Sequence, residues 1–118
     1  MTSKEMVDFS VKLLDDKKAR DITVLEIGKL TTIGDYFVIA SGMSSTQVKT
    51  LAEELEEKFT GKGIEPKRVE GERSAAWILL DYGDVIFHIF YHETRDFYML
   101  ERLWADAPQV NVGELLNS

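Results

Sequence analysis

Two apolar segments that flank a tight-turn signal constrain the fold of this chain most strongly. Residues 75–81 and 84–90 are rich in aliphatic and aromatic side chains, and a glycine lies between them. A two-residue loop at Tyr82-Gly83 is predicted, because glycine takes the positive φ that a hairpin turn requires. The segments therefore form an antiparallel hairpin, and this register places Trp77 opposite His88.

The predicted hairpin has two faces of different character, since opposite residues in an antiparallel pair share a face. The apolar face is expected to point toward the core and consists of Ala76, Ile78, Leu80, Val85, Phe87 and Ile89. The other, which we call the mixed face, consists of Trp77, Leu79, Asp81, Asp84, Ile86, His88 and Phe90. A mixture of aromatic anchors and polar groups is typical of a protein-binding surface. The alternative is that a helix of the same chain covers this face, in which case Trp77 belongs to the core.

The composition narrows the class of protein. A chain of 118 residues, 44% of them hydrophobic, is long enough for one globular domain with a single core. The net charge of −7 argues against a protein that reads nucleic acid directly, and favours a basic partner. Without cysteine the chain has neither disulfides nor a thiol nucleophile. No signal peptide and no membrane-spanning segment is apparent, so we expect a cytoplasmic protein.

The predicted element order is α-β-β-α-β-β-β-α, an α/β (α+β) fold whose mixed sheet of about five strands is flanked by helices. Thr2 and Glu5 form a capping box for the first helix, and Ser44 or Ser45 caps the second. In chain order, the elements are expected near residues 3–16, 22–27, 36–40, 45–62, 67–69, the two hairpin strands, and 94–105. Residues 1–107 are predicted to form a single domain, and residues 108–118 a tail that either docks on it or remains loose.

An ordered set of short motifs is similar to the Iojap-related family, the ribosomal silencing factors. The set is Asp35-Tyr36, Ser41-Gly42, Ser44-Ser45, Glu70-Gly71, Trp77, Asp81, Gly83-Asp84, His88, Tyr98 and Leu103-Trp104. The resemblance extends from the first helix to Pro108. It implies a nucleotidyltransferase-like fold and a translation regulator that needs no catalysis and no cofactor. It also implies binding to the large ribosomal subunit through its fourteenth protein, which sterically blocks association with the small subunit and represses translation under nutrient limitation.

The mixed face is the predicted contact surface for that partner. The predicted contact residues are Trp77, Asp81, Tyr82, Asp84, Ile86, His88, Phe90 and Arg95. Trp77 is the expected central anchor, and an exposed Tyr82 is expected to join the two aspartates in a polar rim. The last helix is expected to pack on the sheet through Tyr98, Leu103 and Trp104.

Two other functions are compatible with the sequence. A nucleotide-binding, nucleotidyltransferase-like enzyme could use the turn at residues 41–45 to hold phosphates. However, the strand that follows the second helix offers Lys67 and Arg68 where such an enzyme needs carboxylates for magnesium. His88 lies roughly 13 Å along the strand from Asp84, too far for one metal ion to bind both. The second function is a homodimer that pairs through the mixed face of the hairpin.

Overall fold

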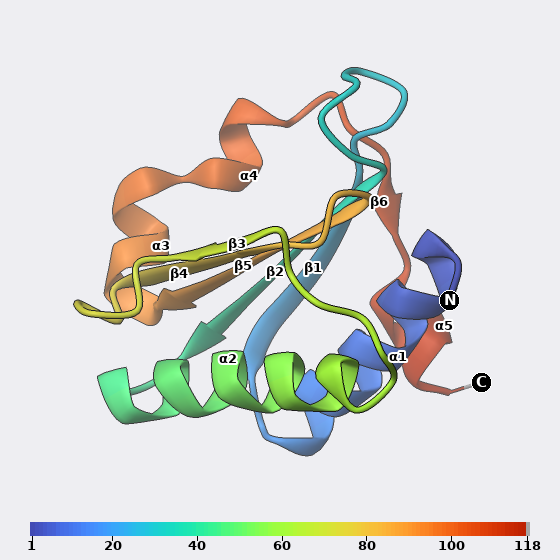
Figure 1. Cartoon of the computed structure of the whole chain (residues 1–118). Helices are drawn as coiled ribbons and strands as arrows, with labels where there is room; N and C mark the ends of the chain where they lie inside the picture. The colour runs from blue at the N-terminus through green and yellow to red at the C-terminus, as the bar shows by residue number, and fades with distance from the viewer. Residues whose placement is uncertain (118) are drawn as a thin grey trace.

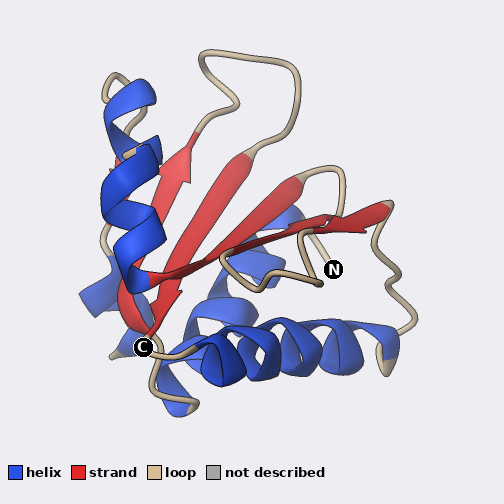
Figure 2. Ribbon diagram, turned by 90° about the vertical axis from the view of Figure 1, so that its left-hand side faces the viewer, coloured by secondary structure: helices blue, strands red, loops and turns tan. Residues whose placement is uncertain are grey.

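The structure is a computed structural model that describes residues 1–117 as a mixed six-stranded sheet with helices on both faces (Figures 1 and 2). The helices are α1 (Ser3–Asp16), α2 (Ser45–Thr60), α3 (His92–Tyr98), α4 (Leu100–Leu103) and α5 (Val112–Leu116). The strands are β1 (Arg20–Glu26), β2 (Tyr36–Gly42), β3 (Arg68–Glu70), β4 (Trp77–Asp81), β5 (Val85–Tyr91) and β6 (Gln109–Val110). None of the helices in this part of the chain has the length and hydropathy needed to cross a membrane.

Local capping signals set where the two long helices begin. The predicted box at the start of α1 is confirmed, because the Thr2 hydroxyl accepts from the Glu5 amide and the Glu5 carboxylate accepts from the Thr2 amide. Ser44 caps α2 by accepting from the Gln47 amide at 3.0 Å. Both helices bury one apolar stripe against the same face of the sheet (Figure 1).

The strand order is β3-β4-β5-β2-β1-β6, with β2 and β5 parallel and the remaining neighbours antiparallel. The expected mixed sheet flanked by helices is confirmed, with one strand more than predicted. The additional strand, β6, comes from the tail and pairs with β1. The α5 helix then packs beside α1, so the tail docks on the body of the protein.

The hairpin register differs from the prediction by two residues. Leu80 lies opposite Phe87, and Tyr82 donates its amide proton to the Val85 carbonyl, so the two loop residues are Gly83 and Asp84. Gly83 has a φ of 87°, and its amide donates to the Asp81 carboxylate at 2.8 Å. A shift of two leaves the side chains of both strands on their predicted faces, whereas a shift of one would have exchanged the faces.

The sheet therefore separates two apolar clusters. The larger lies between the sheet and α1 with α2, and includes Ile78, Leu80 and Phe87 of the apolar face. The smaller lies on the opposite face and joins strand residues to the segment that contains α3 and α4. We call this segment, residues 92–107, the cap.

The cap is not the single helix that the sequence predicted over residues 94–105. Met99 adopts the left-handed conformation, with φ 50° and ψ 47°, and divides α3 from α4. Such a backbone is unfavourable for a side chain other than glycine, so contacts elsewhere must hold it.

Candidate interaction surface

The part of the mixed face formed by Ile86, His88 and Phe90 is buried beneath the cap. Phe90 and Ile86 belong to the smaller cluster, together with Leu100 of α4 and Ala107. His88 is 4% exposed. The prediction that these residues lie on an open surface is wrong, and the alternative, cover by a helix of the same chain, describes them correctly. The physical reason is that the chain after β5 turns back over the face that β5 presents (Figure 1).

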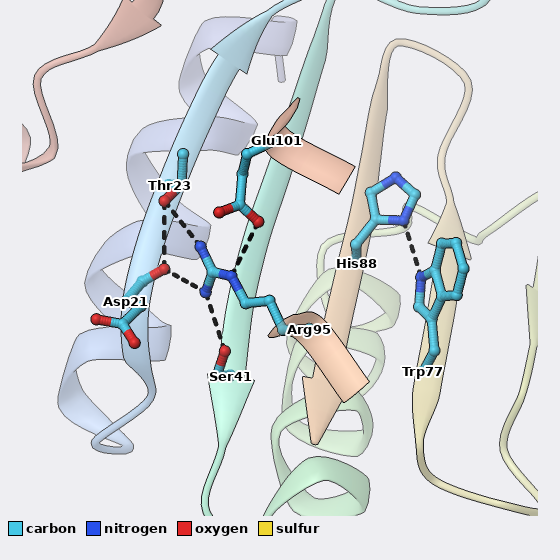
Figure 3. A network of polar contacts seen from close by, with 7 residues as sticks. All are labelled: Asp21, Thr23, Ser41, Trp77, His88, Arg95 and Glu101. Atoms are coloured by element: carbon cyan, nitrogen blue, oxygen red, sulfur yellow. Dashed lines mark hydrogen bonds and ion pairs between the residues drawn. The ribbon is translucent and has the colours of Figure 1, made fainter. Parts of the chain in front are cut away.

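Trp77 is half-buried at the border of the cap. Its ring stacks on Phe90 with centroids 4.8 Å apart, and lies 5.0 Å from the ring of Tyr98 on α3. Its indole Nε1 donates a hydrogen bond to Nδ1 of His88 at 3.1 Å (Figure 3). Burial lowers the pKa of His88 to about 4, so the imidazole is neutral near pH 7 and can accept this bond.

Tyr82 lies on the opposite side of the sheet from its predicted position. In the observed register it continues the alternation from Leu80, so its ring enters the larger cluster between Phe59 and Phe87. Burial raises the pKa of its hydroxyl. The expectation of an exposed rim residue is therefore wrong for Tyr82.

The two aspartates of the predicted rim have different surroundings. The Asp81 carboxylate forms an ion pair with Arg68 at 3.3 Å and remains partly exposed. Asp84 is exposed, and its carbonyl accepts from the amides of Asp35 and Tyr36, which fixes the hairpin loop against residues 28–35.

Arg95 is also buried, contrary to the prediction that it lies on the contact surface. Its guanidinium donates to the Glu101 carboxylate at 3.0 Å, and also reaches β1 and β2 (Figure 3). Among its acceptors is the hydroxyl of Ser41, the residue that begins the turn considered for phosphate binding. Ser44 of the same turn caps α2.

An exposed apolar surface lies on the outside of the cap. We call it the cap patch: Phe97, Tyr98, Met99 and Leu103. Phe97 is 80% and Leu103 is 77% exposed, although both are large apolar side chains. The rings of Phe97 and Tyr98 are 5.2 Å apart, and Tyr98 in turn contacts Trp77, so the patch continues to the edge of β4.

The prediction that Tyr98 and Leu103 pack into the core is wrong. Trp104 is partly buried, with its ring 5.1 Å from that of Phe37. The sequence contained a signal for the patch, because four successive apolar residues, 97–100, point in all directions around a helix. A helix on the surface of a domain buries only one such stripe, so some of these side chains must face outward.

No group of three or more potential metal-binding side chains occurs within residues 1–117. A polar hollow of about 460 Å³ lies beside Arg95, lined by Arg20, Asp21, Thr23, Ser41, Met43, His92, Arg95, Asp96 and Glu101. The lining combines carboxylates with basic side chains, so it does not favour a ligand of one charge.

This chain is similar to a known protein family. The sequence profile of a family described as "Ribosomal silencing factor during starvation" matches residues 1–118. The chain belongs to this family. The resemblance predicted from its motifs is thereby confirmed.

Individual relatives are similar in sequence to this chain over most of its length. The ribosomal silencing factor RsfS of Halalkalibacterium halodurans is 41% identical over 117 residues, which are 99% of this chain and 100% of that protein. A mouse protein named "Mitochondrial assembly of ribosomal large subunit protein 1" is 32% identical over 84% of this chain and 45% of its own length. A crystal structure of protein CV0518 from Chromobacterium violaceum superposes with a TM-score of 0.85 at 35% identity, covering 89% of this chain and 88% of that one.

Proposed function

We propose that this chain is a translation regulator without catalytic activity that binds the large ribosomal subunit through its fourteenth protein. While bound, it sterically prevents association with the small subunit, and it does so under nutrient limitation. Membership in the silencing-factor family supports the regulatory role. The printed name of the mouse relative, which concerns large-subunit assembly, supports the choice of subunit.

The cap patch is the observation that carries the proposal. Burying a phenylalanine or leucine side chain is worth roughly 1.5–3 kcal/mol, so leaving Phe97 and Leu103 in water is unfavourable unless a partner covers them. Aromatic side chains in well-packed positions carry much of the energy of protein interfaces. The patch supplies two of them, and the half-buried Trp77 lies next to it.

The proposed contact surface therefore consists of the cap patch with Trp77 at its border. Asp81 and Asp84 remain the proposed acidic rim, which suits a basic partner together with the net charge of −7. Ile86, His88 and Phe90 support the surface from beneath and do not touch the partner.

Co-sedimentation with purified ribosomal subunits tests this function. We expect the protein to sediment with large subunits and not with small subunits, and to reduce the joining of the two in a sucrose gradient. The double variant Phe97→Ser/Leu103→Ser should lose both effects. Its matched control is Leu30→Ser/Ile33→Ser, which removes two exposed apolar side chains from the loop before β2.

The outcomes separate the parts of the proposal. No binding to either subunit would contradict the function as a whole. Binding that survives in the Phe97/Leu103 variant and fails in the Leu30/Ile33 variant would place the contact on the loop. Retained binding with unimpaired subunit joining would contradict the steric mechanism alone.

A homodimer is a second candidate, because an exposed apolar patch also suits a second copy of the chain. The mixed face is covered, so the pairing would use the cap patch. A concentration series in analytical ultracentrifugation, with the Phe97→Ser/Leu103→Ser variant in parallel, tests it. Self-association that is lost in the variant supports a dimer that competes with the ribosome for the same surface.

A further inference from the structure

Arg95 joins the cap to the sheet through an unusually complete set of hydrogen bonds. Nε donates to Glu101 at 3.0 Å, Nη1 to the Ser41 hydroxyl at 3.0 Å and to the Asp21 carbonyl, and Nη2 to the Thr23 hydroxyl at 2.9 Å (Figure 3). A guanidinium has five N–H donors, and Arg95 donates four hydrogen bonds to other groups of the protein. Arg95 therefore has little capacity left for a partner molecule.

The sheet is distorted at the point where it receives Arg95. The pairing of β1 with β2 shifts between Arg20 and Thr23, and Asp21 takes the left-handed conformation with φ 50°. This bulge turns the Asp21 carbonyl toward the guanidinium. Bulges re-aim backbone groups in this way, and an unfavourable backbone persists only where its surroundings over-determine it.

The same side chain fixes the break between α3 and α4. Arg95 and Glu101 are six positions apart. In an uninterrupted helix they would be rotated by about 240° from one another and could not meet on one side. The left-handed residue Met99 redirects the chain, so that Glu101 returns to the guanidinium. Phe97, on α3, and Leu103, on α4, are thus presented in an arrangement that a straight helix would not give.

We propose that Arg95 is a positioning residue: its bonds to β1, β2 and α4 hold the cap in the kinked form that presents the cap patch to the ribosome. This inference rests on the proposed function and assigns Arg95 a task behind the contact surface. The cap contributes only a few residues to the smaller apolar cluster, so packing alone holds it weakly. Loss of the guanidinium should therefore loosen the cap while the larger cluster keeps the rest of the protein folded.

The test compares Arg95→Met, Arg95→Lys and wild type in large-subunit binding and in hydrogen exchange. We expect Arg95→Met to bind at least roughly tenfold more weakly per folded molecule. Amides of residues 96–103 should exchange faster, whereas those in the middle of α2 should be unchanged. Arg95→Lys should recover part of the binding, because it keeps the charge but not the planar fork.

Three further variants keep the test decisive. Lys58→Met removes a cation from the exposed side of α2, on the other face of the sheet, and should alter neither measurement. Glu101→Leu breaks the link to α4 while Arg95 keeps its bonds to the sheet, so it should reproduce the loss of binding. It also carries the test if Arg95→Met does not fold. Glu101→Gln retains a hydrogen-bond acceptor for Arg95 and should lose less of the large-subunit binding.

Several results would overturn the inference. If Arg95→Met and Glu101→Leu bind like wild type, the cap does not need the guanidinium, and the proposed function stands without this part. If exchange accelerates equally in α2 and in the cap, Arg95 only stabilises the fold as a whole. If wild type binds no subunit, the proposed function fails and this inference fails with it.

Discussion

Trp77 donates its indole N–H to Nδ1 of His88 across 3.1 Å, linking β4 to β5 beneath the cap. Since Nδ1 accepts, the neutral imidazole carries its proton on Nε2. The rings of Phe37 and Phe90 also contact His88. The residue that the sequence suggested as a partner contact is therefore an internal support for the tryptophan.

The first prediction is a loss of stability in mild acid. Burial lowers the pKa of His88 from 6.5 to about 4. Well above pH 6.5 the residue is neutral in both states and contributes no pH dependence. Between 6.5 and 4 the unfolded chain binds a proton that the folded chain does not, so the free energy of unfolding falls, by about 3 kcal/mol in all.

Urea unfolding at several pH values between 7.5 and 4, on wild type and on His88→Gln, measures this effect. Glutamine does not titrate and keeps an acceptor for Trp77, while the carboxylates titrate alike in both proteins. The difference between the two pH profiles isolates the histidine. Parallel profiles would show that His88 does not retain its low pKa.

Replacing Trp77 should affect both binding and stability. We expect Trp77→Ala to weaken large-subunit binding by at least roughly 2 kcal/mol, about thirtyfold. On the open surface that the sequence predicted, Trp77 would contribute little to stability. Because the ring packs on Phe90 and Tyr98 and the change leaves His88 without its donor, we expect a loss of about 2–3 kcal/mol. Urea midpoints and co-sedimentation per folded molecule measure the two effects, and Trp77→Phe, which keeps a ring, should lose less of both. Full binding by Trp77→Ala would remove this residue from the proposed surface.

Tyr82→Phe should leave the protein as stable as wild type or up to about 1 kcal/mol more stable. Its hydroxyl is buried without a hydrogen-bond partner among the described residues, so removing it relieves a desolvation cost. Chemical denaturation measures the change. Ribosome binding should be unaffected, since the ring lies in the larger cluster. A marked loss of binding would instead show that Tyr82 reaches the partner.

Gly71→Ala should destabilise the protein by more than about 2 kcal/mol. Gly71 has a φ of 85°, and a Cβ there would lie 1.9 Å from the Trp77 carbonyl oxygen. The matched control is Gly63→Ala, at a similar φ of 79° but with no atom within 4 Å of the added Cβ. Gly63→Ala should lower the free energy of unfolding only through its strained backbone, by about 1 kcal/mol. Thermal or urea unfolding compares the two, and equal losses would show that the chain moves away from the clash.

The sequence by itself determined the elements whose signals are local. The capping side chain of Thr2 was identified correctly, and Ser44 was one of the two predicted candidates, because an N-cap depends on residues within one turn. The two faces of the hairpin were also correct, although its register was not. Alternation has a period of two, so a two-residue error in the register left Trp77 and Ile78 on the predicted faces. That same error, however, misplaced Tyr82, whose position depended on where the loop begins.

What only the tertiary structure decided is which apolar side chains remain exposed. The apolar side chains on both faces of β4 and β5 indicated that each face must be buried against something. They did not indicate that the chain itself covers the second face. The cap is joined to the sheet by Arg95, which bonds to residues 54 and 74 positions away in the sequence. No local pattern encodes such bonds, because a buried guanidinium must satisfy its donors wherever the fold places acceptors. The left-handed break at Met99 and the outward position of Phe97 and Leu103 are likewise evident only in the folded chain.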